Sequence, residues 1–276
     1  TSFTGEDSLD ISLDAGVSPE GVAEFDGNAH PTGDGLVVDG VSYTFPLGDK
    51  ATVIAGIDTD GSALFTTACV YGGPSNTLDD CGNLVSGITG GGATVGASYD
   101  FGNGLTAAFG AQTTEASVFT EESADDYAFN VAYTGDNYGV SLTYADNEAL
   151  TINETDVTDV TSYALQAYYT PEGSGLPSIS AGYETGETTV TGLGTDHDAE
   201  HWFVGLTWDE VGPGSAGIAI GSTFPTLDIA GVDASTMMEA YYSYPINDGM
   251  TITPGVFIQE GTTDKTGFAV KTSFSF

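Results

Sequence analysis

The stretch that decides the fold class is KTGFAVKTSFSF, Lys265 to Phe276. One side of its alternating pattern is apolar and aromatic: Phe268, Val270, Thr272, Phe274 and Phe276. The other side is small or polar: Gly267, Ala269, Lys271, Ser273 and Ser275. A period of two is typical of a β-strand with one apolar face. This strand ends the sequence on a phenylalanine, at a position where a soluble domain usually frays.

Four internal segments show the same alternation and begin and end on aromatic residues. They are YAFNVAY (127–133), YGVSLTY (138–144), YALQAYY (163–169) and WFVGLTW (202–208). Rings with one polar edge suit the two interfaces of a membrane, so we expect an aromatic belt there. Its predicted members are Tyr127, Tyr133, Tyr138, Tyr144, Tyr163, Tyr169, Trp202 and Trp208. The small and polar residues of the opposite face are then expected to line a lumen.

The whole chain, 1–276, is predicted to be one all-β domain, a transmembrane up-and-down antiparallel barrel. Long and short joins alternate, as they do when short turns lie on one side of a membrane and longer loops on the other. The last strand is expected to pair with the first, because lipid leaves no backbone group unpaired. Sixteen strands are predicted, or fourteen if 1–26 does not hold three: 1–5, 8–15, 20–26, 35–46, 49–58, 93–101, 104–112, 125–134, 138–146, 159–169, 177–186, 199–208, 215–223, 236–246, 249–259 and 266–276.

The composition is strongly acidic. Three lysines, no arginine and 40 acidic residues give a net charge of −37, yet 40% of the residues are hydrophobic, which favours a folded protein. The electrostatic field of such a negatively charged protein repels nucleic acid and attracts cations, so no nucleic-acid partner is expected. No GxSxG, HExxH or CxxC motif occurs, and His30, His197 and His201 lie in or beside predicted loops. We therefore expect no enzyme.

Several stretches resemble the barrel of the cyanobacterial major outer-membrane porins, within the carbohydrate-selective porin superfamily and often labelled iron-uptake porins. The resemblance covers nearly the whole chain: TSFTGEDSLDISLDAG (1–16), FDGNA (25–29), LVVDGVSYTFPLGDKATVIAG (36–56), GGATVGASYDFGNGLTAAFG (91–110), EAYYSYPINDGMTITPGVFI (239–258) and KTGFAVKTSFSF (265–276). It implies a homotrimer in the lipid of a bacterial outer membrane. It also implies insertion by the barrel-assembly machinery, with a C-terminal signal at Phe268, Phe274 and Phe276. Family members carry an N-terminal S-layer-homology domain, so this chain is interpreted as the barrel portion.

The join over 59–92 is exceptionally long. The resemblance implies that it folds into the lumen and narrows the channel, as in general porins; a loop outside the lumen is the alternative. Cys69 and Cys81 both lie in it, and we expect a disulfide that stabilises the loop by about 2–3 kcal/mol, with two free thiols as the alternative.

Ion selectivity is predicted from the charged residues. An anion-preferring constriction needs a cluster of basic side chains, which a chain without arginine does not supply, so we expect a preference for cations that salt weakens. The predicted constriction and selectivity residues are Asp58, Asp60, Asp79, Asp80, Asp10, Asp14 and the single inward base Lys271. The alternative is that most acids lie in external loops.

TDHDAEH (195–201) supplies weak candidates for a transition-metal site, namely Asp196, His197 and His201. A solvated loop is the plainer interpretation. No cofactor is expected, although acidic loops are able to hold Ca²⁺ loosely. The predicted function is a passive, cation-preferring diffusion porin for small hydrophilic solutes and inorganic ions. A metal (iron)-uptake channel and a soluble acidic β-rich surface or binding protein remain as alternatives.

Overall fold

The computed structural model describes residues 3–14, 35–75, 78–88, 91–113, 125–152, 155–173, 175–190, 196–223, 226–227, 235–260 and 264–275. Within these ranges the regular elements are β-strands. No helix long and apolar enough to cross a membrane occurs in the same ranges.

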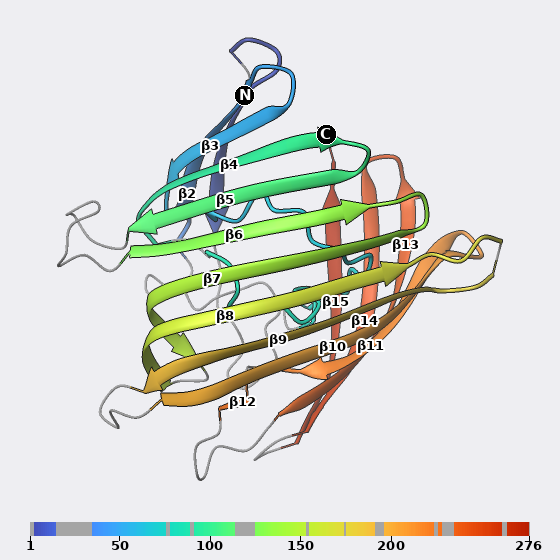
Figure 1. The fold of residues 1–276 in the computed structure, drawn as a ribbon. Helices are drawn as coiled ribbons and strands as arrows, with labels where there is room; N and C mark the ends of the chain where they lie inside the picture. The colour runs from blue at the N-terminus through green and yellow to red at the C-terminus, as the bar shows by residue number, and fades with distance from the viewer. Residues whose placement is uncertain are drawn as a thin grey trace.

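The strands form one antiparallel sheet in which neighbours in sequence are neighbours in space (Figure 1). Its path runs β1-β2-β3-β4-β5-β6-β7-β8-β9-β10-β11-β13-β14-β15, which is fourteen strands, and the short β12 pairs with β10. The strands are β1 (Ser8–Asp14), β2 (Val37–Leu47), β3 (Ala51–Ile57), β4 (Ala93–Gly102), β5 (Leu105–Thr113), β6 (Asp125–Thr134), β7 (Tyr138–Ile152), β8 (Thr155–Tyr169), β9 (Ser178–Val190), β10 (Asp196–Val211), β11 (Gly214–Ser222), β12 (Thr226–Leu227), β13 (Thr236–Asn247), β14 (Met250–Glu260) and β15 (Lys265–Phe274). The predicted all-β, up-and-down architecture is confirmed.

The two faces of the sheet differ as the alternation predicted. Large apolar side chains point outward, and Phe129, Leu142 and Leu165 keep about half of their surface exposed. On the opposite face, called the inner face below, Ala128 and Asn130 are buried. An outer surface this apolar is unfavourable in water and suits contact with lipid.

The predicted number of sixteen strands is not confirmed, whereas the alternative of fourteen matches the path. Residues 3–6 form bends and not part of the strand predicted over 1–5. The reason is local: the Asp7 carboxylate accepts hydrogen bonds from the backbone N–H groups of Phe3 and Thr4, and such turns compete with strand pairing. The strand predicted over 20–26 lies outside the described residues.

The expected closure of the sheet is likewise not observed. The described strands pair from β1 through to β15, and among them β15 does not pair with β1. Among the described residues the two edges of the sheet are therefore β1 and β15.

Two hairpins are longer than the sequence predicts. The polar segment 146–158 was expected to be a long loop, but β7 continues to Ile152 and β8 begins at Thr155, with Asn147 opposite Val160 and Leu150 opposite Val157. Similarly, β9 continues to Val190 and β10 begins at Asp196. Several acids assigned to loops therefore lie on strands that extend beyond the aromatic rows.

Candidate channel constriction

The join between β3 and β4 lies against the inner face of the sheet. Its base is closed by a hydrogen bond from the Asp58 N–H to the Gly92 carbonyl oxygen, 2.9 Å. We call residues 58–92, of which 58–75, 78–88 and 91–92 are described, the inner loop. In Figure 1 its blue-to-teal trace runs within the curve of the sheet. It has an outgoing limb, 61–71, and a return limb, 78–88.

The outgoing limb binds the wall through backbone N–H groups. Thr66 donates to Asn130 Oδ1 on β6 at 3.1 Å, and Ala68 donates to Ser141 Oγ on β7 at 3.0 Å. Val70 donates to Ser180 Oγ on β9 at 3.0 Å. The polar residues of the inner face thus satisfy the buried backbone of a segment that has no strand partner of its own.

The apex of the loop binds β13. The Tyr71 hydroxyl donates to Glu239 Oε1 at 2.7 Å, and the Ser75 N–H donates to Glu239 Oε2 at 3.2 Å. Burial, and then the neighbouring charge of Glu239, raises the pKa of Tyr71 far above its ordinary value. An apolar cluster packs around this contact: Tyr71, Leu78, Cys81, Phe203, Ala219, Met237, Tyr241 and Phe257.

The return limb is held by two side chains of the wall. Gln166 Nε2 on β8 donates to the carbonyl oxygens of Asp80 (2.8 Å) and Cys81 (3.2 Å). Glu184 on β9 accepts from the backbone N–H groups of Leu84, Val85 and Ser86. The inner loop therefore follows the inner face of the sheet out to β13 and back.

At one point the loop backbone meets the wall without room for a side chain. A Cβ added to Gly182 on β9 would overlap the carbonyl oxygen of Cys81. Only glycine permits this approach of two backbones.

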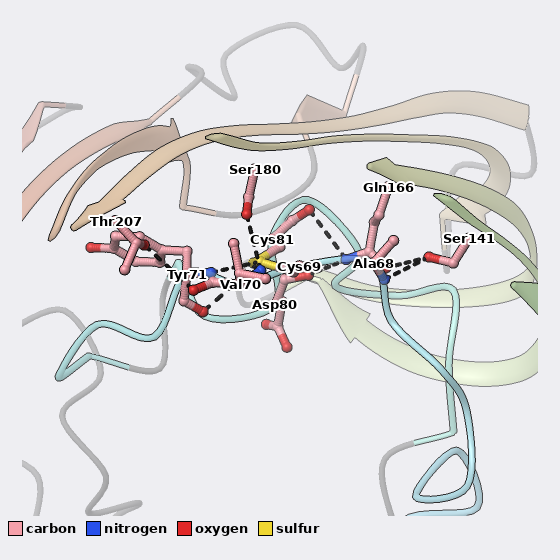
Figure 2. The surroundings of a disulfide bond; sticks show 10 residues. All are labelled: Ala68, Cys69, Val70, Tyr71, Asp80, Cys81, Ser141, Gln166, Ser180 and Thr207. Atoms are coloured by element: carbon pink, nitrogen blue, oxygen red, sulfur yellow. Dashed lines mark hydrogen bonds between the residues drawn. A yellow bond between two sulfur atoms is a disulfide. The ribbon is translucent and has the colours of Figure 1, made fainter. Parts of the chain in front are cut away.

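Cys69 and Cys81 form the predicted disulfide, and their Cα atoms are 6.3 Å apart. It joins the two limbs where both pass β9, beside Ser180 and Gly182. Figure 2 shows Ser180, Gln166 and Ser141 pointing from the strands toward the bridged segment, while the Asp80 carboxylate points away from them. The bridge therefore closes a ring, 69–81, at the far half of the inner loop.

The predicted selectivity residues do not form one cluster. Asp58 and Asp60 lie near the base of the loop and are exposed, and Asp60 Oδ1 accepts from the Ser62 N–H at 2.6 Å. Asp79 and Asp80 lie in the bridged ring, on the return limb.

The three remaining predicted residues lie on the edge strands β1 and β15. Asp10 is on the inner face of β1, opposite Ser42, and Lys271 is on the inner face of β15, opposite Thr253. Asp14 ends β1, and its side chain lies outside the described part of the structure. The acids and the base are therefore divided between the loop and the wall at the two edges of the sheet.

Glu184 and Glu239, which hold the loop, were missed by the sequence analysis. Both are about 1–2% exposed although they are acidic residues in mid-strand. A signal was present: each sits at an inner-face position of a strand, between the outer-face pairs Tyr183 with Thr185 and Met238 with Ala240. An acid at an inner-face position that is otherwise small or neutral indicates a partner in the lumen.

The structure arranges the predicted aromatic residues in two rows on the outer face. Tyr138 and Tyr169 are cross-strand partners near the short turns, and the rings of Tyr133 and Tyr138 are tilted relative to each other, with centroids 5.7 Å apart. Tyr144 and Tyr163 are partners farther along the same strands, with centroids 5.1 Å apart. Tyr127 lies beside Tyr144, and Trp202 and Trp208 lie on β10. Two such rows are typical of a membrane-spanning sheet.

The C-terminal signal is described in part. Phe268 and Phe274 lie on the outer face of β15 and are about two-thirds exposed, whereas Phe276 lies outside the described residues. Its role in assembly stays a prediction.

The weak metal hypothesis gains no support. Asp196, His197 and His201 lie on β10 and not in a loop; four residues along a strand separate the two imidazoles by about 13 Å. The buried His201 contacts Ser222 Oγ through Nδ1 at 2.6 Å. Across the described ranges, no group of three or more His, Cys, Asp or Glu side chains is placed to hold a metal ion.

The chain matches no protein-family model and no curated protein. Among solved structures it is similar to OmpT, an outer membrane protein of Vibrio cholerae. A loop L8 deletion mutant of that protein gives a TM-score of 0.64 at 15% identity, covering 88% of this chain and 82% of that one. The trimer form gives 0.59 at 12% identity, covering 98% and 99%.

Two porins are also similar to this chain over nearly its whole length. An anion-selective porin from Comamonas acidovorans gives a TM-score of 0.63 at 13% identity, covering 98% of this chain and all of that one. A mutant porin of Rh. blastica gives 0.61 at 14% identity, covering all of this chain and 87% of that one. At these identities the likeness shows the fold: that of bacterial outer-membrane porins. The fold and the apolar outer face agree with the predicted location in a bacterial outer membrane.

Proposed function

We propose that the protein is an outer-membrane porin, a passive channel for small hydrophilic solutes and inorganic ions, with a preference for cations. The observation that carries the proposal is the inner loop, which is bound along its length to the inner face of a sheet whose outer face is apolar. A loop so placed narrows a passage without blocking the membrane-facing surface. In a soluble surface or binding protein, exposed leucine and valine between two aromatic rows would be in contact with water, which is unfavourable.

The preference for cations is proposed from charge. The chain has three basic residues against 40 acidic ones, and the acids of the bridged ring, Asp79 and Asp80, lie on the loop that narrows the passage. One structural neighbour is described as anion-selective, so the shared fold does not determine the sign of selectivity. Charges at the constriction determine it.

The test is the reversal potential of the purified protein in a planar bilayer under a KCl gradient. We expect a K⁺ preference that fades as salt rises, because screening shortens the reach of the lumen charges. Equal passage of K⁺ and Cl⁻ at low salt would contradict the cation preference. Folded protein that forms no channels would contradict the porin proposal itself.

Two finer features belong to the same proposal. We propose a homotrimer, as the trimer form of one neighbour suggests, and its mass in detergent by light scattering tests this. The cyanobacterial subtype is supported by the sequence resemblance, which also favours a channel over an enzyme. A metal (iron)-uptake channel is the alternative function; only the resemblance supports it, and conductance with and without iron salts tests it.

A further inference from the structure

We propose that Glu184 is a positioning residue of the channel: its carboxylate fixes the return limb of the inner loop and so sets the width of the passage. This rests on the proposed porin function. It concerns a side chain that lies behind the loop, on the wall strand β9, and not one that faces the passage.

The geometry is that of a carboxylate bound by consecutive backbone donors. Leu84 N–H donates to Oε2 at 2.9 Å, and Val85 N–H donates to Oε1 at 3.0 Å and to Oε2 at 3.1 Å. Ser86 N–H donates to Oε1 as well. Hydrogen bonds to an ionised acceptor are stronger than neutral ones, and three successive N–H groups form a concavity that favours an anion.

The neighbouring contacts converge on the same short segment. Ser86 Oγ donates to Ser162 Oγ on β8 at 2.8 Å, and Asn147 Nδ2 on β7 donates to the Val85 carbonyl oxygen at 3.0 Å. These partners are neutral, and Glu184 alone of the three accepts from more than one N–H. The limb at 84–86 therefore depends most on this one side chain.

The next part of the limb connects this contact to the base of the loop. The Ile88 N–H donates to Ser62 Oγ at 2.7 Å, and the Ile88 carbonyl accepts from the Gly61 N–H at 3.0 Å. The Ile88 side chain packs on Ala128 and Ala145 of the wall. Between the disulfide and Ile88, the other described hydrogen bonds from the limb to the wall are those of Asn147 and Ser162. A limb released at Glu184 would therefore be held over this stretch by these two neutral contacts.

The variant E184Q separates positioning from simple charge. A glutamine keeps the shape, but its Nε2 is a donor and faces backbone donors, so at least one N–H loses its acceptor. If Glu184 positions the limb, the released limb leaves the wall and enters the passage: single-channel conductance and the size limit for neutral solutes fall, and the K⁺ to Cl⁻ ratio stays near its original value. If Glu184 acts as a pore charge, the cation preference falls and the size limit for neutral solutes stays the same.

The matched control is E187Q, which removes the same charge from the same strand at an exposed position. Hydrogen exchange of folded protein in detergent gives a readout that needs no channel. The amides of residues 84–86 are expected to exchange about tenfold faster or more in E184Q, as the loss of one charge-assisted hydrogen bond implies, and unchanged in E187Q. Unchanged protection in E184Q overturns the proposal. Faster exchange with a lower cation preference and an unchanged solute size limit overturns it too.

A milder variant covers the case in which E184Q does not fold. E184D keeps the charge and shortens the side chain by one methylene, so it tests position alone. We expect faster exchange at 84–86 with the cation preference intact, and wild-type protection would overturn the proposal. If wild-type protein forms no channels, the porin function fails, while the exchange data still decide whether Glu184 holds the loop.

A cross-link supplies a rescue. The Oγ atoms of Ser86 and Ser162 lie 2.8 Å apart, so S86C/S162C brings two thiols together on the limb and the wall. Added to E184Q, this disulfide is expected to return conductance and the solute size limit to wild-type values. Formation of the cross-link without any rescue would overturn the link between limb position and passage width.

Discussion

The Tyr71 hydroxyl lies 2.7 Å from Oε1 of Glu239, across 168 positions of the sequence, and joins the apex of the inner loop to β13. With Glu184 on β9, this makes two buried wall carboxylates that each hold one part of the loop. The chain has only three lysines, and these two acids are bound by N–H and O–H donors of the loop. Their burial is favourable because those hydrogen bonds replace the lost water.

The Tyr71 contact predicts a loss of stability at alkaline pH. Burial raises the pKa of Tyr71 in the folded protein above its value of 10.0 when solvated. Below pH 10 the phenol is neutral in both states and the docked loop has its full stability. As pH rises above 10, the solvated phenol ionises first, so stability falls by up to about 1.4 kcal/mol per pH unit until the folded pKa is reached.

The measurement is the thermal midpoint between pH 8 and 11.5, for wild type and Y71F in detergent. The other tyrosines titrate in both proteins, so the difference in slope isolates Tyr71. Wild type is expected to fall more steeply above pH 10. Parallel slopes would show that the hydroxyl is not held in the protonated form by the fold.

The close approach at Gly182 predicts the effect of adding one methyl group. G182A places a Cβ against the Cys81 carbonyl oxygen, so the bridged ring must move from the wall. Overpacking of this kind costs about 1–3 kcal/mol. G72A is the control, because a Cβ at that loop glycine meets no atom within 4 Å. A lower urea midpoint in G182A alone supports the contact, and equal midpoints for the two variants contradict it.

The sequence predicts the strands well and the loop contacts poorly, for a physical reason. In β6 and β10 the alternation of apolar and small residues is local, so it can be recognised from the sequence alone. The sequence analysis missed the extension of β7 and β8 because Asn, Asp and Thr are common in turns. In the structure these residues are in strands because each strand pairs with the other. The contact of Glu184 with residues 84–86 joins positions about 100 apart, and no periodicity records it.

The disulfide is predicted to stabilise the loop without being needed to hold it in place. Closing a short ring restricts the undocked chain, so C69S/C81S is expected to lose about 2–3 kcal/mol of stability. The wall contacts of Tyr71 and the return limb do not involve the bridge, so mean conductance under dithiothreitol is expected to change little. Thermal midpoints and single-channel recordings test the two halves separately. A reductant-induced jump in wild-type conductance, absent from C69S/C81S, would show that the bridge itself fixes the passage.

The bridged ring also predicts where the cation preference arises. In Figure 2 the Asp80 carboxylate points away from the wall residues that hold the ring. Asp79, the preceding residue, is exposed. D79N/D80N removes both charges and leaves the Gln166 contacts, which use backbone carbonyls. We expect a smaller reversal potential at low salt, and no difference from wild type near 1 M, where the screening length is about 3 Å.

The control for that variant is D136N, which removes a charge from the exposed turn between β6 and β7. A turn charge lies at the mouth, where water and salt screen it, so its effect on the reversal potential is expected to be smaller per charge than that of the ring. If D136N changes the reversal potential as much per charge removed as D79N/D80N does, the cation preference comes from the electrostatic field of the whole acidic chain. A ring-specific loss places the selectivity at the apex of the inner loop, on the segment that Glu239 and Gln166 hold in place.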